Sequence, residues 1–138
     1  MTLHETDLNE RLDEMDIFEA SHDSGVYALE VDAPSEPTVA KERWDQHHDK
    51  RPPEDTLTRV AAAEDVYYVG AASNVYRRLT EHISGDVRRA TFLEAFPPIA
   101  LERIWLTGTD PTKAEFNTAV KLAQRDGTVA WSDGVLRG

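Results

Sequence analysis

Three short segments rich in β-forming residues alternate with segments of helical spacing, and this order limits the folds open to the chain. The β-rich segments are residues 25–31, 66–70 and 99–107, and turn residues precede the first. A chain of 138 residues has room for one compact core but not for two ordinary domains. We therefore predict a single α+β domain over residues 1–138, with a small three-stranded mixed or antiparallel sheet flanked by helices.

Helices are predicted before and after the second strand from apolar spacing and from residues that begin and end helices. An amphipathic helix over residues 5–18 occupies the N-terminal segment 1–22. Ser73 is expected to cap a short helix that Gly85 ends. A further helix is expected from residue 86 to residue 96, where two prolines stop it.

The last predicted helix has Asp110 as its cap, Pro111 in its first position and Gly127 at its end. Its expected apolar face consists of Phe116, Ala119, Val120 and Ala123. We expect the short tail that follows to be anchored by Trp131.

Residues 32–65 differ in character from both neighbouring strands, because prolines and the charged run KERWDQHHDKR occupy much of this segment. We predict an insertion that loops out of the domain, with one short helix around Trp44 and a brief helical turn at residues 57–63. His47 and His48 could suggest a metal site, but their charged, proline-flanked setting favours a solvated loop. A protein partner, if there is one, is expected to bind through this insertion.

The chain is strongly acidic, with 26 acidic residues against 15 basic ones and a net charge of −11. Its lysines are Lys41, Lys50, Lys113 and Lys121, and the other basic residues are arginines. This lysine-poor, acidic composition resembles that of proteins from salt-loving archaea, since at about 1 M salt the Debye length falls to about 3 Å and self-repulsion is screened. Taken alone, the charge argues against nucleic acid as a partner.

Cysteine is missing from the sequence, which excludes disulfides, thiolate zinc sites and a cysteine nucleophile. Any metal would therefore bind to oxygen or imidazole. The first ten residues are polar and acidic, and no apolar run reaches the length of a membrane span. We accordingly expect neither a signal peptide nor a membrane partner.

Two tyrosines, an arginine and a histidine occupy positions that neighbouring elements can bring together. If the first two strands pair, Tyr27 and Tyr68 approach one site. Arg78 and His82 follow on the next helix, four residues apart and therefore on one face. Taken singly, the tyrosines would be a packed aromatic pair and the other two residues a solvated helix face. Only the combination points to chemistry.

The tripeptide GVY at residues 25–27, followed by YVGAASNVYRRLTEH at residues 68–82, resembles the signature of GIY-YIG nucleases. This family includes homing endonucleases, some restriction enzymes and the incision nuclease of nucleotide-excision repair. The resemblance covers roughly residues 24–126, and VYYVG with the later DVRRATFLEAFPP is similar to stand-alone GIY-YIG proteins of haloarchaea and their viruses. It implies a GIY-YIG fold and a location in a high-salt archaeal cytoplasm or in association with a virus.

The resemblance also implies a DNA endonuclease whose catalytic residues are Tyr27, Tyr68, Arg78, His82 and Glu115. Glu115 is the best match to the family's metal-binding glutamate, and a single carboxylate with water suits Mg²⁺ or Mn²⁺. The metal would polarise the phosphodiester and Arg78 would hold its non-bridging oxygens. Tyr27 would accept the proton of the attacking water and Tyr68 would position that water, or the reverse. This role requires a tyrosine pKa lowered by nearby cations, and His82 would pass the proton on.

Arginines gather around this motif. Arg77, Arg78, Arg88 and Arg89 stand against Glu81 and Asp86, so four positive and two negative charges leave a local net of +2. We expect DNA to lie here, in contact with Arg77, Arg88 and Arg89.

A second hypothesis keeps the GIY-YIG fold without the activity, as a binding or structural component of a virus particle or a nucleoprotein assembly. In its favour, the tail WSDGVLRG lacks the asparagine with which family members brace the site, the gap between the tyrosines is long, and no separate DNA-reading module is present in the sequence. The five matching site residues favour the nuclease. A generic small α/β domain would make all five matches accidental. The DNA target and the oligomeric state stay open.

Overall fold

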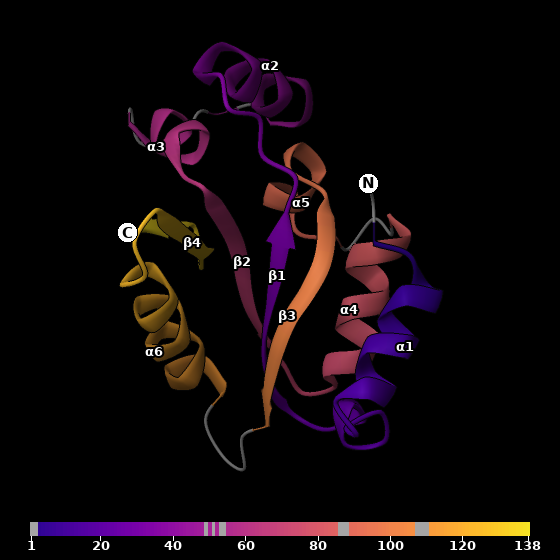
Figure 1. Ribbon diagram of the computed structural model, residues 1–138. Helices are drawn as coiled ribbons and strands as arrows, with labels where there is room; N and C mark the ends of the chain where they lie inside the picture. Colours follow the sequence, from indigo (N-terminus) through magenta and orange to yellow (C-terminus); the bar gives the residue numbers. More distant parts are fainter. Residues whose placement is uncertain (1–2, 49, 51, 53–54, 86–88, 107–110) are drawn as a thin grey trace.

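Five strands form one mixed sheet in the computed structural model, which describes residues 3–48, 50, 52, 55–85, 89–106 and 111–138 (Figure 1). The strands are β1 (Gly25–Val31), β2 (Asp65–Ala72), β3 (Pro98–Leu106), β4 (Thr128–Ser132) and β5 (Val135–Arg137). They lie in the order β3-β1-β2-β4-β5, and β2 and β4 are parallel while the other described pairs are antiparallel. The α+β class is confirmed, whereas the expectation of three strands is wrong because the tail adds two more.

The two additional strands form a hairpin after helix α6 (Pro111–Ala123). Ser132 pairs with Val135, which leaves Asp133 and Gly134 as a two-residue loop with φ angles of +50° and +77°. Asp-Gly is a residue pair that such loops favour, since both positions need positive φ. This signal is present in the sequence and predicts the hairpin that our three-strand expectation omits.

The two faces of the sheet carry separate cores. Val26 and Ala28 of β1 lie in the core beneath α6. Tyr27 and Leu29 alternate with them and lie in the larger core on the opposite face. In Figure 1, α6 covers one side of the sheet, and helices α1 (Glu5–Glu14) and α4 (Val75–Ser84) lie on the other.

Helix α6 packs through a face that matches the expected one only in part: Ala119 and Ala123 belong to it, and Leu122 is buried there as well. It begins at Pro111, as predicted, while the expected cap Asp110 lies outside the described residues. Ala119 is fully buried against the sheet, whereas Phe116 is 52% exposed. Because residues four apart share a helix face, Glu115 lies on the same side as Ala119.

The N-terminal helix α1 ends at Glu14, earlier than expected, and a short 3-10 helix, η1 (Ala20–His22), precedes β1. Arg11 of α1 donates from Nε to the Leu101 carbonyl at 3.2 Å and from Nη2 to the Glu102 carbonyl at 3.4 Å. Both carbonyls belong to β3, which is an edge strand of the sheet. Arg11 therefore covers polar backbone groups that an open edge would expose.

The segment between β1 and β2 is folded onto the domain rather than looped out of it. It forms α2 (Pro37–His47) and α3 (Thr56–Ala62). Trp44 of α2 is 5% exposed, and its ring lies 5.8 to 6.5 Å from three other ring centroids, those of Phe92, Phe96 and Trp131. His47 is exposed, as expected for a solvated segment, but His48 stacks on Trp44 at 3.7 Å between centroids.

Helix α4 begins after Asn74 instead of Ser73, because the Asn74 side chain accepts a hydrogen bond from the backbone N–H of Arg77 at 3.1 Å. Gly85 ends the helix at a φ of +76°, as predicted. Helix α5 (Thr91–Ala95) is shorter than the helix expected from residue 86, and residues 86–88 lie outside the described part. Within the described chain, no helix has the length and apolarity that crossing a membrane requires.

Candidate functional site

Tyr27 and Tyr68 lie on the same face of the sheet because of the register between β1 and β2. Tyr27 pairs with Gly70 and Leu29 pairs with Tyr68, so the two tyrosines are diagonal neighbours on adjacent strands. Their ring centroids are 6.3 Å apart. The structure thus brings the two phenols together, as the strand pairing assumed from the sequence requires.

Two glycines are needed here because other atoms occupy the space of their missing side chains. A Cβ atom built at Gly70 would lie 2.5 Å from Cζ of Tyr27, since the tyrosine ring crosses this residue on the neighbouring strand. A Cβ atom at Gly25 would lie 2.8 Å from the carbonyl oxygen of Trp105. Both distances are too short for real contacts, so the glycines at the start of β1 and near the end of β2 let the tyrosine and the three strands pack closely.

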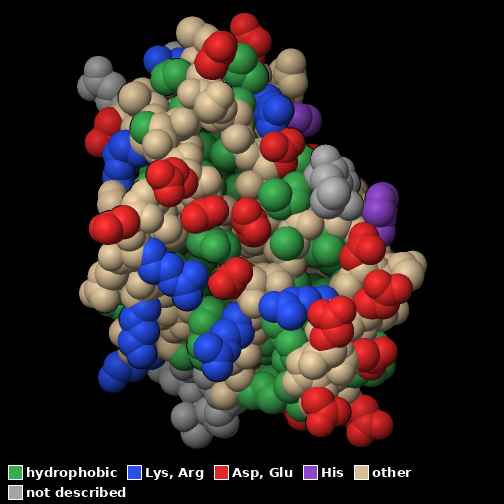
Figure 2. Space-filling view, viewed as in Figure 1, with side chains coloured by type: hydrophobic (Ala, Val, Ile, Leu, Met, Phe, Trp, Pro, Cys, Tyr) green, Lys and Arg blue, Asp and Glu red, His purple; other side chains and the backbone are tan. Residues whose placement is uncertain are grey.

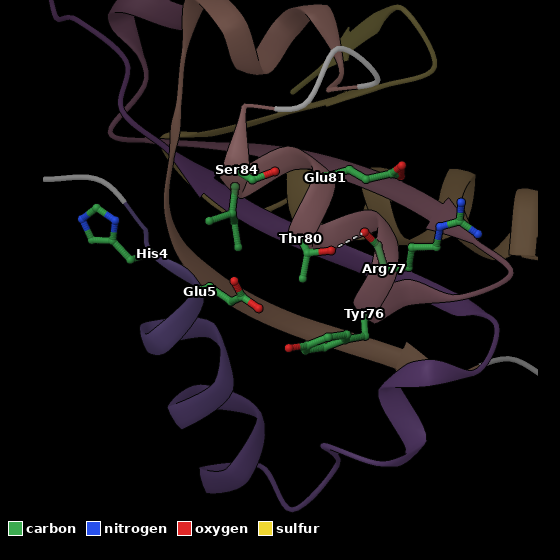
Figure 3. Close-up of a pocket in the computed structure, with 8 residues that line it drawn as sticks. His4, Glu5, Tyr76, Arg77, Thr80, Glu81 and Ser84 are labelled. Carbon is green, nitrogen blue, oxygen red and sulfur yellow. Dashed lines mark hydrogen bonds between the residues drawn. The ribbon is translucent and has the colours of Figure 1, made fainter.

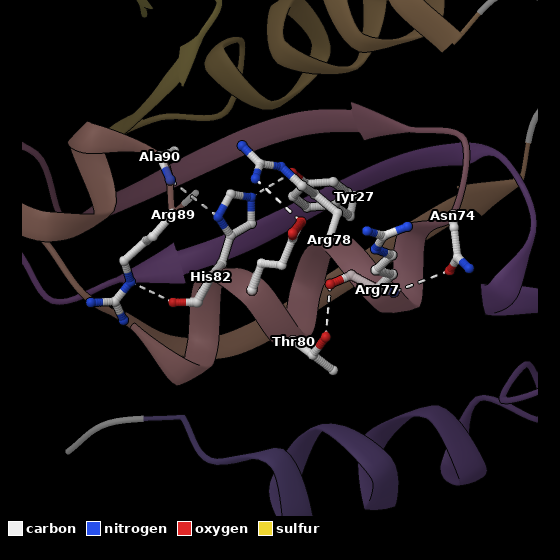
Figure 4. A network of polar contacts seen from close by, with 9 residues as sticks. Tyr27, Asn74, Arg77, Arg78, Thr80, His82, Arg89 and Ala90 are labelled. Carbon is white, nitrogen blue, oxygen red and sulfur yellow. Dashed lines mark hydrogen bonds and ion pairs between the residues drawn. The ribbon is translucent and has the colours of Figure 1, made fainter. Parts of the chain in front are cut away.

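His82 projects from α4 onto Tyr27 and is fully buried. Its Nε2 atom lies 2.7 Å from the Tyr27 hydroxyl (Figure 4). On the other side of the ring, the backbone N–H of Ala90 donates to Nδ1 at 3.3 Å. In the neutral imidazole the proton must then be on Nε2, so His82 donates its hydrogen bond to the Tyr27 oxygen.

The protonation state of His82 follows from its surroundings. Burial, and then the charges of Arg78 and Arg89, lower the pKa of His82 from 6.5 to about 3. The ring is therefore neutral at ordinary pH and is placed to orient Tyr27. This geometry does not favour the expected role of passing a proton on.

Arg78 connects the buried phenols with the solvent. Its side chain is 30% exposed, and Nη1 lies 3.5 Å from Oε1 of Glu81. Its positive charge lowers the pKa of both Tyr27 and Tyr68, which means that the guanidinium lies within electrostatic range of each. Arg78 is thus the cation at the mouth of the tyrosine pair.

The pKa values of both tyrosines are nevertheless raised, contrary to the expectation that cations would lower them. Burial is the largest cause for Tyr27, which is 1% exposed, and also for the less buried Tyr68. The charge of Arg78 opposes burial without outweighing it. A hydrogen bond with Tyr27 also lowers the pKa of Tyr68 and so opposes the effect of burial.

Glu115 of α6 is coupled to this group through its charge. Its carboxylate raises the pKa of both Tyr27 and Tyr68, so it lies within electrostatic range of the two phenols. The pKa of Glu115 itself is raised, first by burial and also by Asp133, while the Ser132 hydroxyl is the largest of the influences that lower it. Tyr27, Tyr68, Arg78 and His82 therefore lie close together, whereas Glu115 belongs to α6, which packs on the other face of the sheet, and is linked to the two tyrosines through its charge.

Asp133 also lies near the site of the tyrosines and Glu115, although the sequence patterns did not indicate it. It lies in the β4–β5 loop, and its charge raises the pKa of both Glu115 and Tyr68. Its proximity to the site depends on the hairpin, so only recognition of the Asp-Gly turn could have suggested it from the sequence.

The site around Glu115 offers a divalent cation only a few oxygen ligands from the described residues. The described residues contain no group of three histidine, aspartate or glutamate side chains that could hold a metal ion. Glu115, with Asp133 near enough to raise its pKa, offers the hard oxygen atoms that Mg²⁺ prefers. Glu115, with Asp133 beside it, is therefore the carboxylate at this place that could hold such an ion, and water would have to complete the coordination.

The site opens to solvent where β2 leads into α4. A hollow of about 210 Å³ lies there and is lined by Ala72, Ser73, Asn74, Arg77, Arg78 and Glu81. A larger hollow of about 700 Å³ lies between the start of α1 and α4, and Tyr76, Arg77 and Glu81 line it (Figure 3). Arg77 and Glu81 belong to both hollows, so the exposed surface of α4 continues from one into the other.

The three arginines expected to contact nucleic acid have different positions. Arg77 lines both hollows, and Arg78 lines the smaller one with it. Arg89 donates from Nε to the carbonyl of His82 in the last turn of α4 (Figure 4). Arg88 lies outside the described residues.

No protein-family model, curated protein or solved structure was found to match this chain.

Proposed function

We propose that this chain is an endonuclease of the GIY-YIG type, which hydrolyses DNA phosphodiester bonds with one Mg²⁺ or Mn²⁺ ion. The observation that carries the proposal is the meeting of Tyr27, Tyr68, Arg78 and His82 from β1, β2 and α4. Structural aromatic pairs are common in cores, but this pair lies beside a partly exposed arginine and within range of a carboxylate, and these are groups that phosphodiester hydrolysis can use.

Arg78 would bind the phosphate. Its planar guanidinium can donate two parallel hydrogen bonds to non-bridging oxygens, which stabilises the charge that develops during hydrolysis. Its position supports this role, because the side chain is 30% exposed, lines a hollow open to the solvent, and lies within electrostatic range of both tyrosines.

Tyr68 would accept the proton of the attacking water, which exchanges the roles first expected for the two tyrosines. Tyr68 is the more exposed of the pair, whereas Tyr27 is 1% exposed. His82 donates to Tyr27, and Tyr27 can then turn its own proton toward Tyr68, whose pKa this hydrogen bond lowers. The row of donors ending at Tyr68 opposes the rise that burial causes in the pKa of Tyr68.

Glu115 would hold the metal ion, and Asp133 would add negative charge beside it. When bound, the ion would supply Lewis-acid polarisation of the phosphate and would favour the ionised form of nearby acids. Asp133 lies in the tail where members of the family carry a bracing asparagine, so it is our candidate for the residue that replaces it.

The test is nicking of supercoiled plasmid and of branched DNA in KCl at about 1 M, where a charge of −11 is well screened. With Mg²⁺ or Mn²⁺ we expect the wild type to cut, and Tyr68→Phe, Arg78→Ala and Glu115→Gln to lose about 100-fold or more in rate. Tyr67→Phe is the matched control, because Tyr67 neighbours Tyr68 on β2 but lies in the core on the opposite face. Its rate should stay within about twofold of the wild type.

Absence of metal-dependent cutting by the folded wild type would overturn the enzyme proposal. A loss of activity in Tyr67→Phe equal to that in Tyr68→Phe would show that the aromatic substitution acts through the fold.

The second candidate is a non-catalytic DNA-binding module with the same fold. The burial of Tyr27 and His82 and the raised pKa of both tyrosines favour it, since these groups are poorly suited to proton transfer without further help. It predicts that the wild type binds DNA in the plasmid assay and leaves it intact with every divalent cation.

A further inference from the structure

A second group of cations lies on the opposite face of the sheet from the tyrosines. Arg103 and Trp105 of β3 pair with Ala28 and Val26 of β1, whose side chains face α6. Lys121 and Arg125 approach the same place from α6. Between the helix and the strand is a hollow of about 460 Å³, which we call the α6–β3 groove.

The charge of the α6–β3 groove is opposite to that of the chain. None of its described lining residues is acidic, although acids outnumber bases by 26 to 15 in the sequence. Arg103, Lys121 and Arg125 are all exposed. Figure 2 shows Lys and Arg side chains gathered over α6 and the lower part of β3, while Asp and Glu side chains lie above them and gather at the lower right of the same view. Glu102 lies 3.5 Å from Arg125 and compensates the charge of this one arginine.

The chemistry of the groove fits a nucleic-acid strand better than an acidic peptide. The partly buried indole of Trp105 has the guanidinium of Arg103 5.6 Å from its ring centroid, an arrangement of flat apolar surface and planar cation on which a base can stack. Asn117 and Thr118 add neutral hydrogen-bonding groups beside the cations. Phosphate oxygens accept hydrogen bonds from such groups as well as from lysine and arginine, and the aromatic surface beside them offers a base a place to stack.

The groove and the tyrosine site open toward the same end of the sheet. Trp105 pairs with Val26, which pairs with Ala71, the residue before the hollow that contains Arg78. A polynucleotide held in the groove on one face is therefore close to the end of the sheet at which Arg78 is reached on the other.

We propose that the α6–β3 groove is a second nucleic-acid contact, which binds the backbone of a DNA strand through Arg103, Lys121 and Arg125 with a base against Trp105. The inference rests on the proposed function for the choice of DNA as the polyanion. The groove binds DNA outside the tyrosine site and does not depend on catalysis.

Binding is measured by fluorescence anisotropy of labelled single-stranded and duplex oligonucleotides in EDTA, over a series of KCl concentrations at which circular dichroism shows each protein to be folded. We expect Arg103→Ala/Lys121→Ala to weaken binding about tenfold or more and to reduce the salt slope by about 2, because each of the two cations neutralises one phosphate. Lys41→Ala/Arg43→Ala on α2 removes the same charge elsewhere and should leave the affinity within about twofold. Lys121→Glu should weaken binding, and Lys121→Arg should retain it.

Equal binding by the wild type and Arg103→Ala/Lys121→Ala would overturn the proposal, and so would an equal loss of affinity in the α2 control. Competition by polyglutamate as effective as that by DNA would assign the groove to an acidic protein instead. The plasmid assay separates the two proposals: a wild type that does not cut, with groove variants that bind more weakly, refutes only the nuclease. A wild type that cuts, with groove variants that bind normally, refutes only the groove.

Discussion

The hydroxyl of Tyr27 and Nε2 of His82 are joined by a 2.7 Å hydrogen bond between two buried side chains. The Ala90 amide on Nδ1 makes His82 the donor in this bond. The pair therefore depends on a neutral imidazole, and protonation of His82 would place a charge in a site that has no room for its hydration.

This dependence predicts a specific loss of stability in acid. The folded protein keeps His82 neutral down to about pH 3, whereas the unfolded value is about 6.5. The stabilisation is therefore complete above pH 6.5 and is lost as the pH falls toward 3, at up to about 1.4 kcal/mol per pH unit. In urea unfolding at fixed high salt, His82→Gln should lose stability less steeply across this range than the wild type. His47→Gln, at an exposed position, should follow the wild type, and parallel curves for His82→Gln would refute the prediction.

The close approach of Tyr27 to Gly70 predicts a coupled pair of substitutions. Gly70→Ala puts a methyl group where the tyrosine ring lies, and should lower the free energy of unfolding by about 1–3 kcal/mol. In a Tyr27→Ala background the space is free, so the same substitution should cost less than about 0.5 kcal/mol. Chemical denaturation of the four proteins measures this coupling, and equal costs in the two backgrounds would mean that the ring is not the obstacle.

From the burial of Trp44 we predict that the segment between β1 and β2 is required for folding. Its ring is 5% exposed and lies among the rings of Phe92, Phe96 and Trp131. Trp44→Ala should therefore lower the free energy of unfolding by about 3–5 kcal/mol. His47→Ala on the same helix should change it by less than about 0.5 kcal/mol. If the two variants unfold alike, α2 is dispensable and the segment behaves as the insertion expected from the sequence.

The hydrogen bonds of Arg11 to β3 lead us to expect that this side chain protects the open edge of the sheet. Arg11→Ala removes the hydrogen bonds to the carbonyls of Leu101 and Glu102, and should cost about 1–2 kcal/mol and promote self-association through the freed edge. Glu14→Ala removes only the ion pair of Arg11 with Glu14 at 3.7 Å, which should cost less than about 0.5 kcal/mol. Urea unfolding and sedimentation velocity report the two effects. Indistinguishable variants would mean that the carbonyl contacts contribute nothing.

The sequence determined the elements whose signals are local. The alternation of residues 25–31 predicted β1 with its observed bounds, Pro111 marked the start of α6, and Gly85 marked the end of α4 because it can adopt a positive φ. The sequence also contains the pair Asp133-Gly134, which favours a two-residue hairpin loop because both residues can adopt a positive φ. The spacing of Arg78 and His82 placed both on one helix, and the structure brings them to the tyrosines.

Only the tertiary structure decided what depends on contacts between distant segments. It places β4 in parallel beside β2, folds Trp44 into the aromatic cluster, and turns Phe116 outward so that Glu115 faces the sheet. It also reverses the expected electrostatics, because the exclusion of water around Tyr27 and Tyr68 outweighs the charge of Arg78. Residue order specifies which groups are close along the chain, but burial and the resulting pKa depend on every segment that packs around a group, and those segments meet only in the folded protein.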